Sequence, residues 1–390
     1  MNNQTIPSPS ETNAAAGITP VGIWFKHVEI AKNNFLHKSL SDWACNPSVG
    51  CLHGCRFCYV PEVSTRKLST PLGERGVGDP DANWGEYAFL RTFDEKKFRA
   101  SVRKAEKVPA NELSHDGHRA IMFSTTTDPY QVFFHPDAKQ RKELNQASAA
   151  MMTRMLEIIR DESTLNVRIL TRSPLVRADF EVLKSLGNRV VLGMSLPTLR
   201  ADLAKLYEPG APAPARRLET LQLAQKAGIP VCVMMAPTFP ECDRADLKAT
   251  LEAIKSVNPV TIFHEPINIR ADNAQRIAGH AQKLGITANT EVFASKEAWE
   301  RYALQSFADM EAVAKEVGLY DRLHLWVDGA LGTKTFLKKA PNPEAHQAWV
   351  NYWWNRVSEW AGQEASVINT MQAPPNPLDL ECARKEEVTR

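Results

Sequence analysis

The sequence predicts an α/β fold in which a parallel sheet forms a partial (β/α)6 barrel of the TIM type, with a mostly helical C-terminal extension. Two observations lead to this prediction. From about Arg119 onward, short runs rich in Val, Ile, Leu, Met and Phe alternate with longer helical patterns, as strands buried on both faces alternate with crossover helices. After Ile269 the pattern becomes mostly helical, with one further strand-like run at residues 323–327.

Five runs are expected to be barrel strands, at residues 119–124, 167–171, 190–195, 230–235 and 260–264. Helical segments are expected at residues 138–160, 175–186, 199–227 and 244–256, each long enough to connect parallel strands. Gly187 and Gly228 lie where helices end before the next strand, and Asp243 is placed to cap the helix that follows it. A first strand at residues 46–50 brings the count to about six units and leaves an open side.

Composition divides the chain into four parts. Residues 1–20 are rich in Ser, Thr, Asn, Ala and Pro and are expected to be disordered. The barrel is expected at residues 21–270, the helical extension at 271–373 and a flexible tail at 374–390. Five tryptophans of the C-terminal region are expected to pack the extension against the barrel, or alternatively to form a stacking platform for a ring: Trp299, Trp326, Trp353, Trp354 and Trp360.

Charge and hydropathy exclude several classes of protein. Lys and Arg total 47, Asp and Glu total 45, and a net charge of +2 provides no general attraction for nucleic acid. Nucleic acid is therefore a possible partner that the composition does not favour. The N-terminus lacks the basic start and apolar run of a signal peptide, and no apolar run is long enough to cross a bilayer. We expect a cytoplasmic protein with no membrane partner.

Three of the seven cysteines lie within eight residues, at Cys51, Cys55 and Cys58. In a reducing compartment this clustering indicates metal binding or catalysis rather than disulfides. Thiolates suit both iron–sulfur clusters and zinc. Three cysteines bind three irons of a cubane cluster and leave the fourth iron open to a small chelating ligand. Structural zinc requires a fourth protein ligand, which would have to be Cys45, His53 or a distant residue.

The wider segment resembles the radical S-adenosylmethionine (SAM) superfamily, in particular the branch that contains spore photoproduct lyase. The resemblance rests on Asn46-Pro47 before the cysteines, on Gly50, His53 and Gly54 among them, and on Tyr59 directly after them. Further matching segments lie at residues 124–130, 171–173, 195–198, 208–209, 217–218 and 227–231. The resemblance covers roughly residues 42–270.

This resemblance implies a [4Fe–4S] cluster held by Cys51, Cys55 and Cys58, with SAM chelating the open iron through its amino and carboxylate groups. An electron donor such as flavodoxin or ferredoxin would supply the electron that cleaves SAM to methionine and a 5′-deoxyadenosyl radical. The radical would abstract hydrogen from a substrate, here an unidentified small molecule, peptide or nucleoside. The protein would orient both molecules and exclude water, while the cofactor performs the chemistry.

Polar residues after the second expected strand are candidates for binding SAM. Ser124, Thr125, Thr126 and Asp128 match the family segment that holds the ammonium group and ribose of SAM. The alternative is an ordinary Ser/Thr turn that Asp128-Pro129 ends.

Further candidates follow the later strands. Arg172 is expected to bind the carboxylate of SAM in a bidentate fork, although the related lyases have Lys there. Ser195 is a candidate contact to the ribose or carboxylate, and a plain turn serine is the alternative. Met234 and Met235 end the fifth strand, where a soft side chain can pack against adenine or fill the core. Glu265 ends the sixth strand and is a candidate contact to the ribose or the substrate.

The resemblance also gives Tyr59 a role, because the family has an aromatic residue near SAM at this position and the lyase uses a tyrosine to relay a radical. Phe57 stands where the lyase has a second tyrosine, and Phe has no O–H to donate. The remaining cysteines are Cys45, Cys232, Cys242 and Cys382. We expect them to be buried hydrophobic residues. The alternative, that one of them donates a hydrogen atom or is a second ligand, stays open.

Three functions therefore stay open. A radical SAM enzyme with an unidentified substrate is favoured. A spore photoproduct lyase-like DNA repair enzyme is less favoured, because the lyase has its hydrogen-donating cysteine well downstream of the cluster motif and this chain has no cysteine between Cys58 and Cys232. A non-catalytic iron–sulfur or zinc module is disfavoured by the polar residues at the strand ends. Residues 65–84 and the C-terminal aromatic residues are the segments expected to select the substrate.

Overall fold

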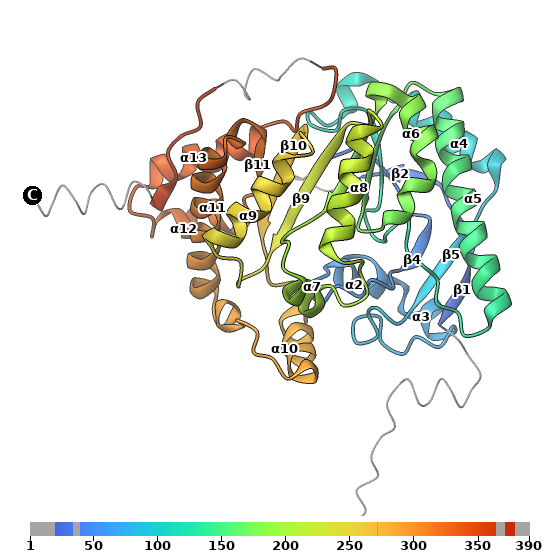
Figure 1. Cartoon of the computed structure of the whole chain (residues 1–390), viewed down its shortest axis with the longest axis horizontal. Helices are drawn as coiled ribbons and strands as arrows, with labels where there is room; N and C mark the ends of the chain where they lie inside the picture. The colour runs from blue at the N-terminus through green and yellow to red at the C-terminus, as the bar shows by residue number, and fades with distance from the viewer. Residues whose placement is uncertain (1–19, 34–39, 271, 364–370, 379–390) are drawn as a thin grey trace, which may run out of the picture.

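The computed structural model describes residues 20–33, 40–270, 272–363 and 371–378 (Figure 1). Its centre is an eight-stranded sheet in the order β11-β10-β9-β8-β7-β6-β3-β2. Only β2 runs antiparallel to its neighbour, and the strands from β3 to β11 are parallel. The predicted α/β fold with a partial parallel barrel is thereby confirmed, and the further strand expected at residues 323–327 is β11. The segments expected to be disordered or flexible, residues 1–20 and 374–390, lie largely outside the described residues.

The strands of the large sheet are β2 (Ile30–Lys32), β3 (Trp43–Cys45), β6 (Ala120–Phe123), β7 (Asn166–Thr171), β8 (Val190–Ser195), β9 (Val231–Thr238), β10 (Thr261–Pro266) and β11 (Leu323–Leu325). The five predicted strands from residue 119 to 264 are confirmed within a few residues. The prediction that residues 46–50 form the first barrel strand was wrong. The barrel strand is β3, because Pro47 has no N–H for the ladder and its carbonyl instead accepts from the N–H of Arg91, 2.9 Å away.

Residues beyond Pro47 join a second, three-stranded sheet of order β1-β5-β4, built from β1 (Val21–His27), β5 (Ala88–Thr92) and β4 (Ser48–Gly50). Around it lie α2 (Val60–Val63), η1 (Thr65–Leu68), α3 (Ser69–Gly73), α4 (Glu95–Glu106) and η2 (Ala110–Glu112). The segment 65–84, expected to be a substrate loop, packs Leu72, Val77 and Trp84 into a small core that also contains Cys51. In this structure it therefore supports the cysteine loop from one side.

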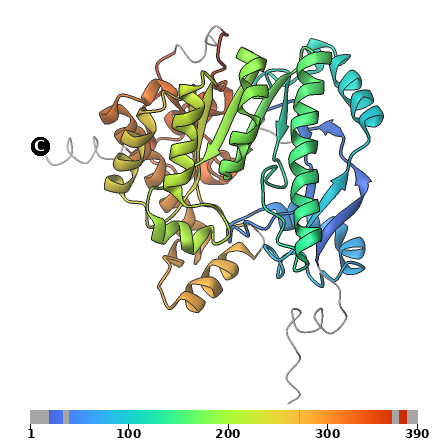
Figure 2. The same ribbon diagram turned by 45° about the vertical axis from the view of Figure 1, so that its right-hand side comes forward.

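Helices cover the outer face of the large sheet (Figures 1 and 2). They are α5 (Ala138–Glu162), η3 (Pro174–Asp179), α6 (Phe180–Leu186), η4 (Gly187–Arg189), α8 (Pro214–Lys226) and α9 (Arg244–Lys255). The helix α7 (Ala201–Tyr207) lies instead at the carboxyl ends of the strands, in a cluster with Phe239. The helix expected at residues 199–227 is divided into α7 and α8, because Pro209 and Pro212 interrupt backbone hydrogen bonding between them. Asp243 caps α9 as predicted, and its side chain accepts from the N–H of Asp246.

The C-terminal part is helical, as expected. It contains α10 (Asn273–Leu284), η5 (Glu291–Phe293), α11 (Lys296–Val317), η6 (Tyr320–Arg322), η7 (Gly329–Gly332), α12 (Lys334–Leu337) and α13 (Pro343–Asn355). Trp299, Trp353 and Trp360 are buried, and the indole N–H of Trp299 donates to the carbonyl of Ile267 at the end of β10. Packing is therefore the role of these tryptophans. No helix among the described residues is long and apolar enough to span a membrane.

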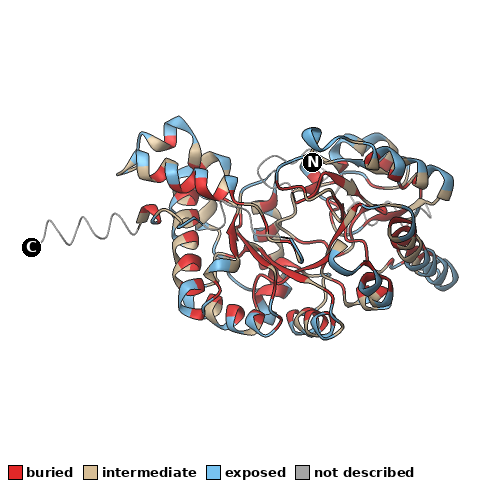
Figure 3. Ribbon diagram, turned by 90° about the horizontal axis from the view of Figure 1, so that it is seen from above, coloured by how far each residue is buried: buried red, intermediate tan, exposed pale blue. Residues whose placement is uncertain are grey.

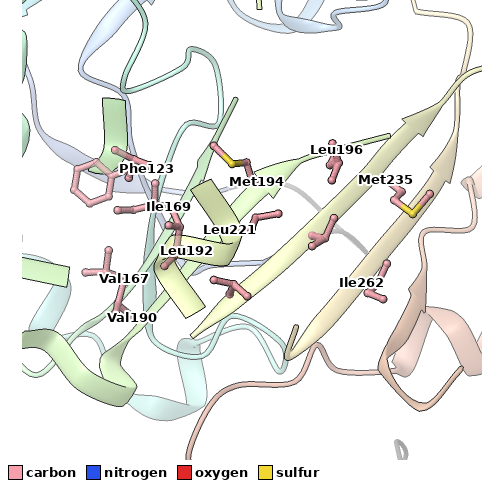
Figure 4. Packing of buried hydrophobic residues seen from close by; sticks show 14 of the residues in the cluster. Phe123, Val167, Ile169, Val190, Leu192, Met194, Leu196, Leu221, Met235 and Ile262 are labelled. Carbon is pink, nitrogen blue, oxygen red and sulfur yellow. The ribbon is translucent and has the colours of Figure 1, made fainter. Parts of the chain in front are cut away.

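Side chains of the large sheet alternate between two cores, as the two-residue period of a strand requires. The helix-facing core contains Phe123, Ile169, Leu192, Met235 and Ile262 (Figure 4). The barrel interior contains Met122, Leu170, Val191, Met234 and Phe263. Figure 3 shows the strands as a buried layer within partly exposed helices. By the same alternation, the residues that end the strands on the interior side are Ser124, Arg172, Ser195 and Glu265.

The amino end of the barrel is closed by a buried arginine. The Nε of Arg168 donates to the carbonyl of Leu40 at 2.9 Å, and one Nη donates to the hydroxyl of Ser358 at 3.1 Å. Its guanidinium lies 4.9 Å from the ring centre of Trp360, a distance typical of cation–π contacts. The C-terminal segment thereby seals one end, so the carboxyl ends of the strands form the open end of the barrel.

Two buried histidines should make the free energy of unfolding depend on pH. Burial lowers the pKa of His264 and of His324 to about 3, from 6.5. Between pH 6.5 and 3 the unfolded chain therefore binds protons that the folded chain does not, so acidification destabilises the fold by about 1.4 kcal/mol per pH unit for each group. Urea unfolding from pH 7 to 4 should show this loss. In His264→Gln the free energy of unfolding should fall less steeply with acidification than in wild type. The matched control, His115→Gln, changes an exposed histidine and should keep the wild-type slope. Equal slopes in wild type and both variants would contradict the role of His264.

Candidate functional site

The three clustered cysteines lie on a short loop, residues 51–58, between β4 and α2. Two turns shape this loop: the N–H of Gly54 donates to the carbonyl of Cys51 at 3.3 Å, and the N–H of Cys58 donates to the carbonyl of Cys55 at 3.1 Å. Cys51 and Cys55 are buried, and Cys58 is half-buried. The loop therefore presents three thiols from one compact segment near the carboxyl ends of the barrel strands.

Contacts from distant elements hold the backbone of the cysteine loop. The N–H of Leu52 donates to Oε1 of Gln131 at 2.8 Å. The N–H of Arg56 donates to the carbonyl of Tyr207, also at 2.8 Å. From α10, Nη2 of Arg276 donates to the carbonyl of Cys58 at 2.6 Å and Nε donates to that of Arg56 at 3.1 Å. The loop has little regular structure of its own, so these contacts determine its shape.

Two glycines allow other segments to approach the loop closely. Gly54 has φ of +56°, and a Cβ there would lie 2.9 Å from the Cα of Gly85. A Cβ on Gly210, which follows α7, would lie 2.4 Å from the carbonyl oxygen of Leu52. Any larger residue at either position would force backbone to move. The loop is therefore packed backbone to backbone on two sides.

The chemistry of the thiols fits a metal cluster. Burial raises the pKa of all three, that of Cys51 to about 12, and the charge of Cys58 further raises the pKa of Cys51 and of Cys55. Without a metal these thiols stay protonated and unreactive, whereas a coordinating metal displaces the proton. Arg172 and Arg276 act in the opposite direction by favouring the thiolates of Cys55 and Cys58. Buried thiols flanked by cations suit an anionic thiolate cluster.

A single metal ion has no comparable site. Across residues 20–33, 40–270, 272–363 and 371–378, no group of three or more His, Cys, Asp or Glu side chains is arranged to hold one ion. A cubane cluster is wider and takes each thiolate on a different iron, so its ligands need not converge on one point. The donor set thus fits [4Fe–4S], and the zinc alternative gains no support from the described residues.

Asn46 fixes the loop that follows β6. Its Oδ1 accepts from the N–H groups of Thr125 and Thr126 at 3.0 and 2.9 Å. Its Nδ2 donates to the hydroxyl of Thr125 at 2.8 Å. Ser124 has φ of +96°, a conformation that costs a non-glycine residue energy and persists where surrounding contacts enforce it. Ser124 and Thr126 are half-exposed, whereas Thr125 is buried. The hydroxyls of Ser124 and Thr126 are therefore available to a ligand.

Asp128 is buried and ties three segments together. Its Oδ1 accepts from the hydroxyl of Thr171 at 2.7 Å, and its Oδ2 accepts from the N–H of Arg172 at 2.8 Å. Nδ1 of His53, in the cysteine loop, lies 3.4 Å from the same Oδ2. Burial alone would raise the pKa of Asp128, but His53 and these donors lower it. The structure thus places this predicted cofactor ligand as a link between the loop and the strand ends.

Arg172 belongs to a buried ion network. Its Nε donates to Oε1 of Glu208 at 2.6 Å, and Nη1 of Arg217 lies 2.6 Å from Oε2 of the same carboxylate. Glu208 and Arg217 have fully buried side chains, whereas that of Arg172 is 18% exposed. Burial alone would lower the pKa of Arg172, but Cys55 and Glu208 raise it. Among the described residues, neither Nη of Arg172 makes a hydrogen bond to protein, so both remain available as donors.

Tyr59 and Glu265 lie near the same end of the barrel. The hydroxyl of Tyr59 donates to the carbonyl of Thr125 at 2.7 Å. Burial raises the pKa of Tyr59, and so do Cys58 and Glu265, while Arg172 acts in the opposite direction. The two predicted catalytic residues are therefore brought together with the cysteine loop. Ser195 is buried, and its carbonyl accepts from Arg217 at 3.1 Å.

Met235 does not face this site. It lies fully buried in the helix-facing core, while its neighbour Met234 lies in the barrel interior. The predicted contact of Met235 with adenine has no geometric basis, because adjacent strand residues point to opposite faces. Of the other cysteines, Cys45 lies 3.9 Å from the sulfur of Met155 in the core. Cys232 lies 3.9 Å from Nη1 of Arg168, Cys242 is half-buried, and Cys382 is outside the described residues.

Four residues with roles at this site were not singled out from the sequence: Asn46 and Glu208, noted only as part of the resemblance, and Gln131 and Arg276. Gln131 is buried, and its Nε2 donates to the hydroxyls of Ser48 and Thr127, both at 2.8 Å. All four are polar residues, and each has at least one partner far along the chain. The only sequence signal for Asn46 and Glu208 was their place in short motifs, each next to a proline.

Comparison with known proteins agrees with this geometry. The model of the radical SAM superfamily matches residues 45–254, more than half of the chain. The chain belongs to the radical SAM superfamily. This superfamily consists of enzymes, so the prediction of an enzyme is confirmed. An uncharacterized protein of Acidianus two-tailed virus is 32% identical over 254 residues, which cover 63% of this chain and 74% of that protein.

Other relatives of this radical SAM protein extend the comparison. An uncharacterized protein of Methanocaldococcus jannaschii is 22% identical over 67% of this chain and 82% of its own length. A spore photoproduct lyase mutant with bound AdoMet and dinucleoside spore photoproduct has a similar structure, with a TM-score of 0.54 and 11% identity over 84% of this chain and 87% of that chain. A second lyase mutant gives a TM-score of 0.55 at 11% identity, over 84% and 86%. At this identity the likeness shows the fold alone.

The buried ion network gives a stability prediction. Glu208→Gln removes the carboxylate that lies between two cations and, among the described residues, leaves the buried Arg217 without a counter-charge. Breaking a buried ion pair from one side costs about 3–5 kcal/mol. Urea unfolding should detect this loss in the purified variant.

The matched control is Glu316→Gln, which makes the same change at an exposed ion pair with Lys248. Exposed pairs contribute about 0–1 kcal/mol, so this variant should unfold close to wild type. Equal losses in the two variants would show that the Glu208 network does not carry the stability we assign to it.

Proposed function

We propose that this protein is a radical SAM enzyme whose [4Fe–4S] cluster is held by Cys51, Cys55 and Cys58. SAM would bind between the cysteine loop and the carboxyl ends of the barrel strands, and the substrate would enter through the same open end. One observation carries the proposal: two buried thiols and one half-buried thiol share one loop, and Arg172 presents two unpartnered Nη groups beside it. As a radical SAM enzyme the protein requires an electron donor and a substrate.

When bound and reduced, the cluster and SAM supply a 5′-deoxyadenosyl radical for hydrogen abstraction. The protein's own residues bind and orient SAM. Arg172, held at Nε by Glu208, offers its two Nη groups to the carboxylate as a planar fork. The half-exposed hydroxyls of Ser124 and Thr126 would hold the ribose or ammonium group, in a loop that Asn46 and Tyr59 hold in place. Ser195 lines the same end.

Thr125 and Asp128, predicted as ligands, act in this proposal as positioning residues, because their polar groups already bond to protein. Met234 replaces Met235 as the methionine that faces the interior. Glu265 lies at the open end, where it can contact the ribose or substrate. The apolar residues deeper in the barrel, among them Val191 and Phe263, exclude water from the reactive region.

A spore photoproduct lyase-like activity is the second candidate. The shared fold supports it, since lyase structures cover 84% of the chain. Two observations weigh against it: Phe57 packs 5.7 Å from Phe239 and has no hydroxyl, and Cys232 lies deep in the barrel beside Arg168. A zinc or non-catalytic module is the third candidate, and nothing in the described site favours it.

Iron loading tests the cluster ligands. After anaerobic reconstitution, wild type should carry about four irons per chain, show the brown absorption of a cluster, and form 5′-deoxyadenosine from SAM under reduction. Cys55→Ala should lose the cluster and the product. Cys45→Ala, which removes a thiol from the core instead, should keep both. Wild type that binds one zinc tightly and never cleaves SAM would exclude the enzyme proposal.

SAM affinity tests the role of Arg172. Arg172→Ala should weaken binding to the iron-loaded protein by about tenfold or more, because charged hydrogen bonds contribute about 1.5–3 kcal/mol. Iron content should be unchanged. Isothermal calorimetry measures both variant and control, and Met235→Leu is the control because Met235 faces the helices. Unchanged affinity in Arg172→Ala would place the carboxylate elsewhere.

Deuterium transfer tests the substrate class. Candidate small molecules, peptides and nucleosides labelled with deuterium should be incubated with SAM, reductant and enzyme, and the label followed into 5′-deoxyadenosine by mass spectrometry. A thymine-dimer oligonucleotide belongs in the same panel. Transfer or repair with that oligonucleotide would establish the lyase alternative, whereas transfer from another compound would identify the substrate class.

A further inference from the structure

The cysteine loop borders a group of basic residues on the surface. Arg56 follows Cys55 directly in the loop, Lys205 lies on α7, and His280 and Lys283 lie on α10. We call these four residues the basic patch. Figures 1 and 2 show α7 and α10 side by side near α2, and Nε2 of His280 lies 3.3 Å from the carbonyl oxygen of Lys205. The two helices therefore bring the basic residues together next to Arg56.

Little negative charge offsets the basic patch. Lys205 and Lys283 are exposed, and neither has an ion-pair partner among the described residues. Glu86 lies near Arg56, and Asp81 is already paired with Arg276. Burial lowers the pKa of His280, and the charges of Arg56, Lys283 and Lys205 lower it further. The lowered pKa leaves His280 uncharged at neutral pH, so the positive charge of the patch comes from Arg56, Lys205 and Lys283, in a chain whose net charge is only +2.

Hydrogen bonds connect the helices of the basic patch to the cysteine loop. Arg56 is bonded to α7 through the carbonyl of Tyr207 at 2.8 Å, and its own carbonyl accepts from Arg276 of α10 at 3.1 Å. The same Arg276 donates to the carbonyl of Cys58 at 2.6 Å. Both helices of the patch are therefore hydrogen-bonded to the loop that holds Cys55 and Cys58. A partner on the patch would sit close to the thiols without entering the barrel.

We propose that the basic patch docks an acidic one-electron donor protein, such as a flavodoxin or ferredoxin, for reduction of the cluster. The proposal rests on the proposed function. The anionic flavin hydroquinone would give one electron to the cluster and become the neutral semiquinone, so no proton or bond changes hands. Electron-transfer encounters bury small interfaces, and complementary charge raises their association rate, so a patch with three cationic side chains is sufficient.

Nucleic acid would also be attracted by positive charge, but it fits this surface less well. Phosphate backbones bind through extended rows of Lys and Arg, whereas the patch has four basic residues with Glu86 and Asp81 beside them. A nucleic-acid substrate would also have to reach the open end of the barrel. The protein donor therefore remains the favoured occupant, and an oligonucleotide enters the test as the competing one.

A charge reversal tests the docking surface. Lys205→Glu/Lys283→Glu should weaken binding of a purified acidic flavodoxin by about tenfold or more at low salt, and high salt should erase the difference because it screens exposed charge. Flavodoxin-dependent reduction, followed by cluster absorbance, should slow by a similar factor. Lys184→Glu/Lys226→Glu is the control, because it makes the same charge change on exposed residues of α6 and α8 that lie near the amino ends of the strands.

Reduction by dithionite separates the two proposals. This small reductant needs no docking surface, so it should bleach the cluster equally in wild type and in both double variants. Wild type that forms no 5′-deoxyadenosine from SAM with any reductant would refute the proposed function itself. A patch variant that binds and accepts electrons from flavodoxin as wild type does would refute the docking surface alone. Loss of oligonucleotide binding, with flavodoxin reduction unchanged, would also refute it and assign the patch to nucleic acid.

Discussion

The structure of this protein is organised around the burial of three thiols on a loop with little regular structure of its own. Burial disfavours their ionisation, so the loop is suited to a metal cluster and poorly suited to a free nucleophile. Because no helix or sheet holds its backbone, the loop depends on donors and acceptors from elsewhere. Gln131, Tyr207 and Arg276 provide them from three separate parts of the chain. The barrel, the support at residues 65–84 and α10 are arranged around this requirement.

The charged side chains of the ion network near the cysteine loop are paired with opposite charges. Arg172 lies beside Cys55, but its Nε end is held by Glu208, and Glu208 is balanced in turn by Arg217. The network desolvates several charges and compensates each one, which a buried site requires. Deeper in the barrel the interior is mainly apolar, with Arg168 at the sealed end and His324 packed 5.3 Å from the ring centre of Phe263. A reactive intermediate formed at the strand ends would thus face oriented polar groups on one side and a dry interior on the other.

Much of the fold followed from periodicity, and the failures have identifiable causes. Strands of four to eight residues buried on both faces gave clear apolar runs, and their order was predicted correctly. The three-residue strands β2, β3 and β4 are too short to show a period, so the first barrel strand was misplaced. The small sheet was missed because β1 and β5 pair across about sixty residues of intervening chain, and alternation in one strand does not identify its partner.

The sequence by itself determined the order of strands and helices and the three thiols on one loop, because hydrophobic period and cysteine spacing are local properties. Tertiary structure decided the rest of the site. It decided that Met234 and not Met235 faces the interior, because a one-residue shift in register exchanges the two faces. It also brought Asn46, Glu208 and Arg276 to the loop and strand ends, and their partners lie tens to hundreds of residues away. A polar side chain carries no periodic signal of such a partner, so only the folded chain could assign these residues their roles.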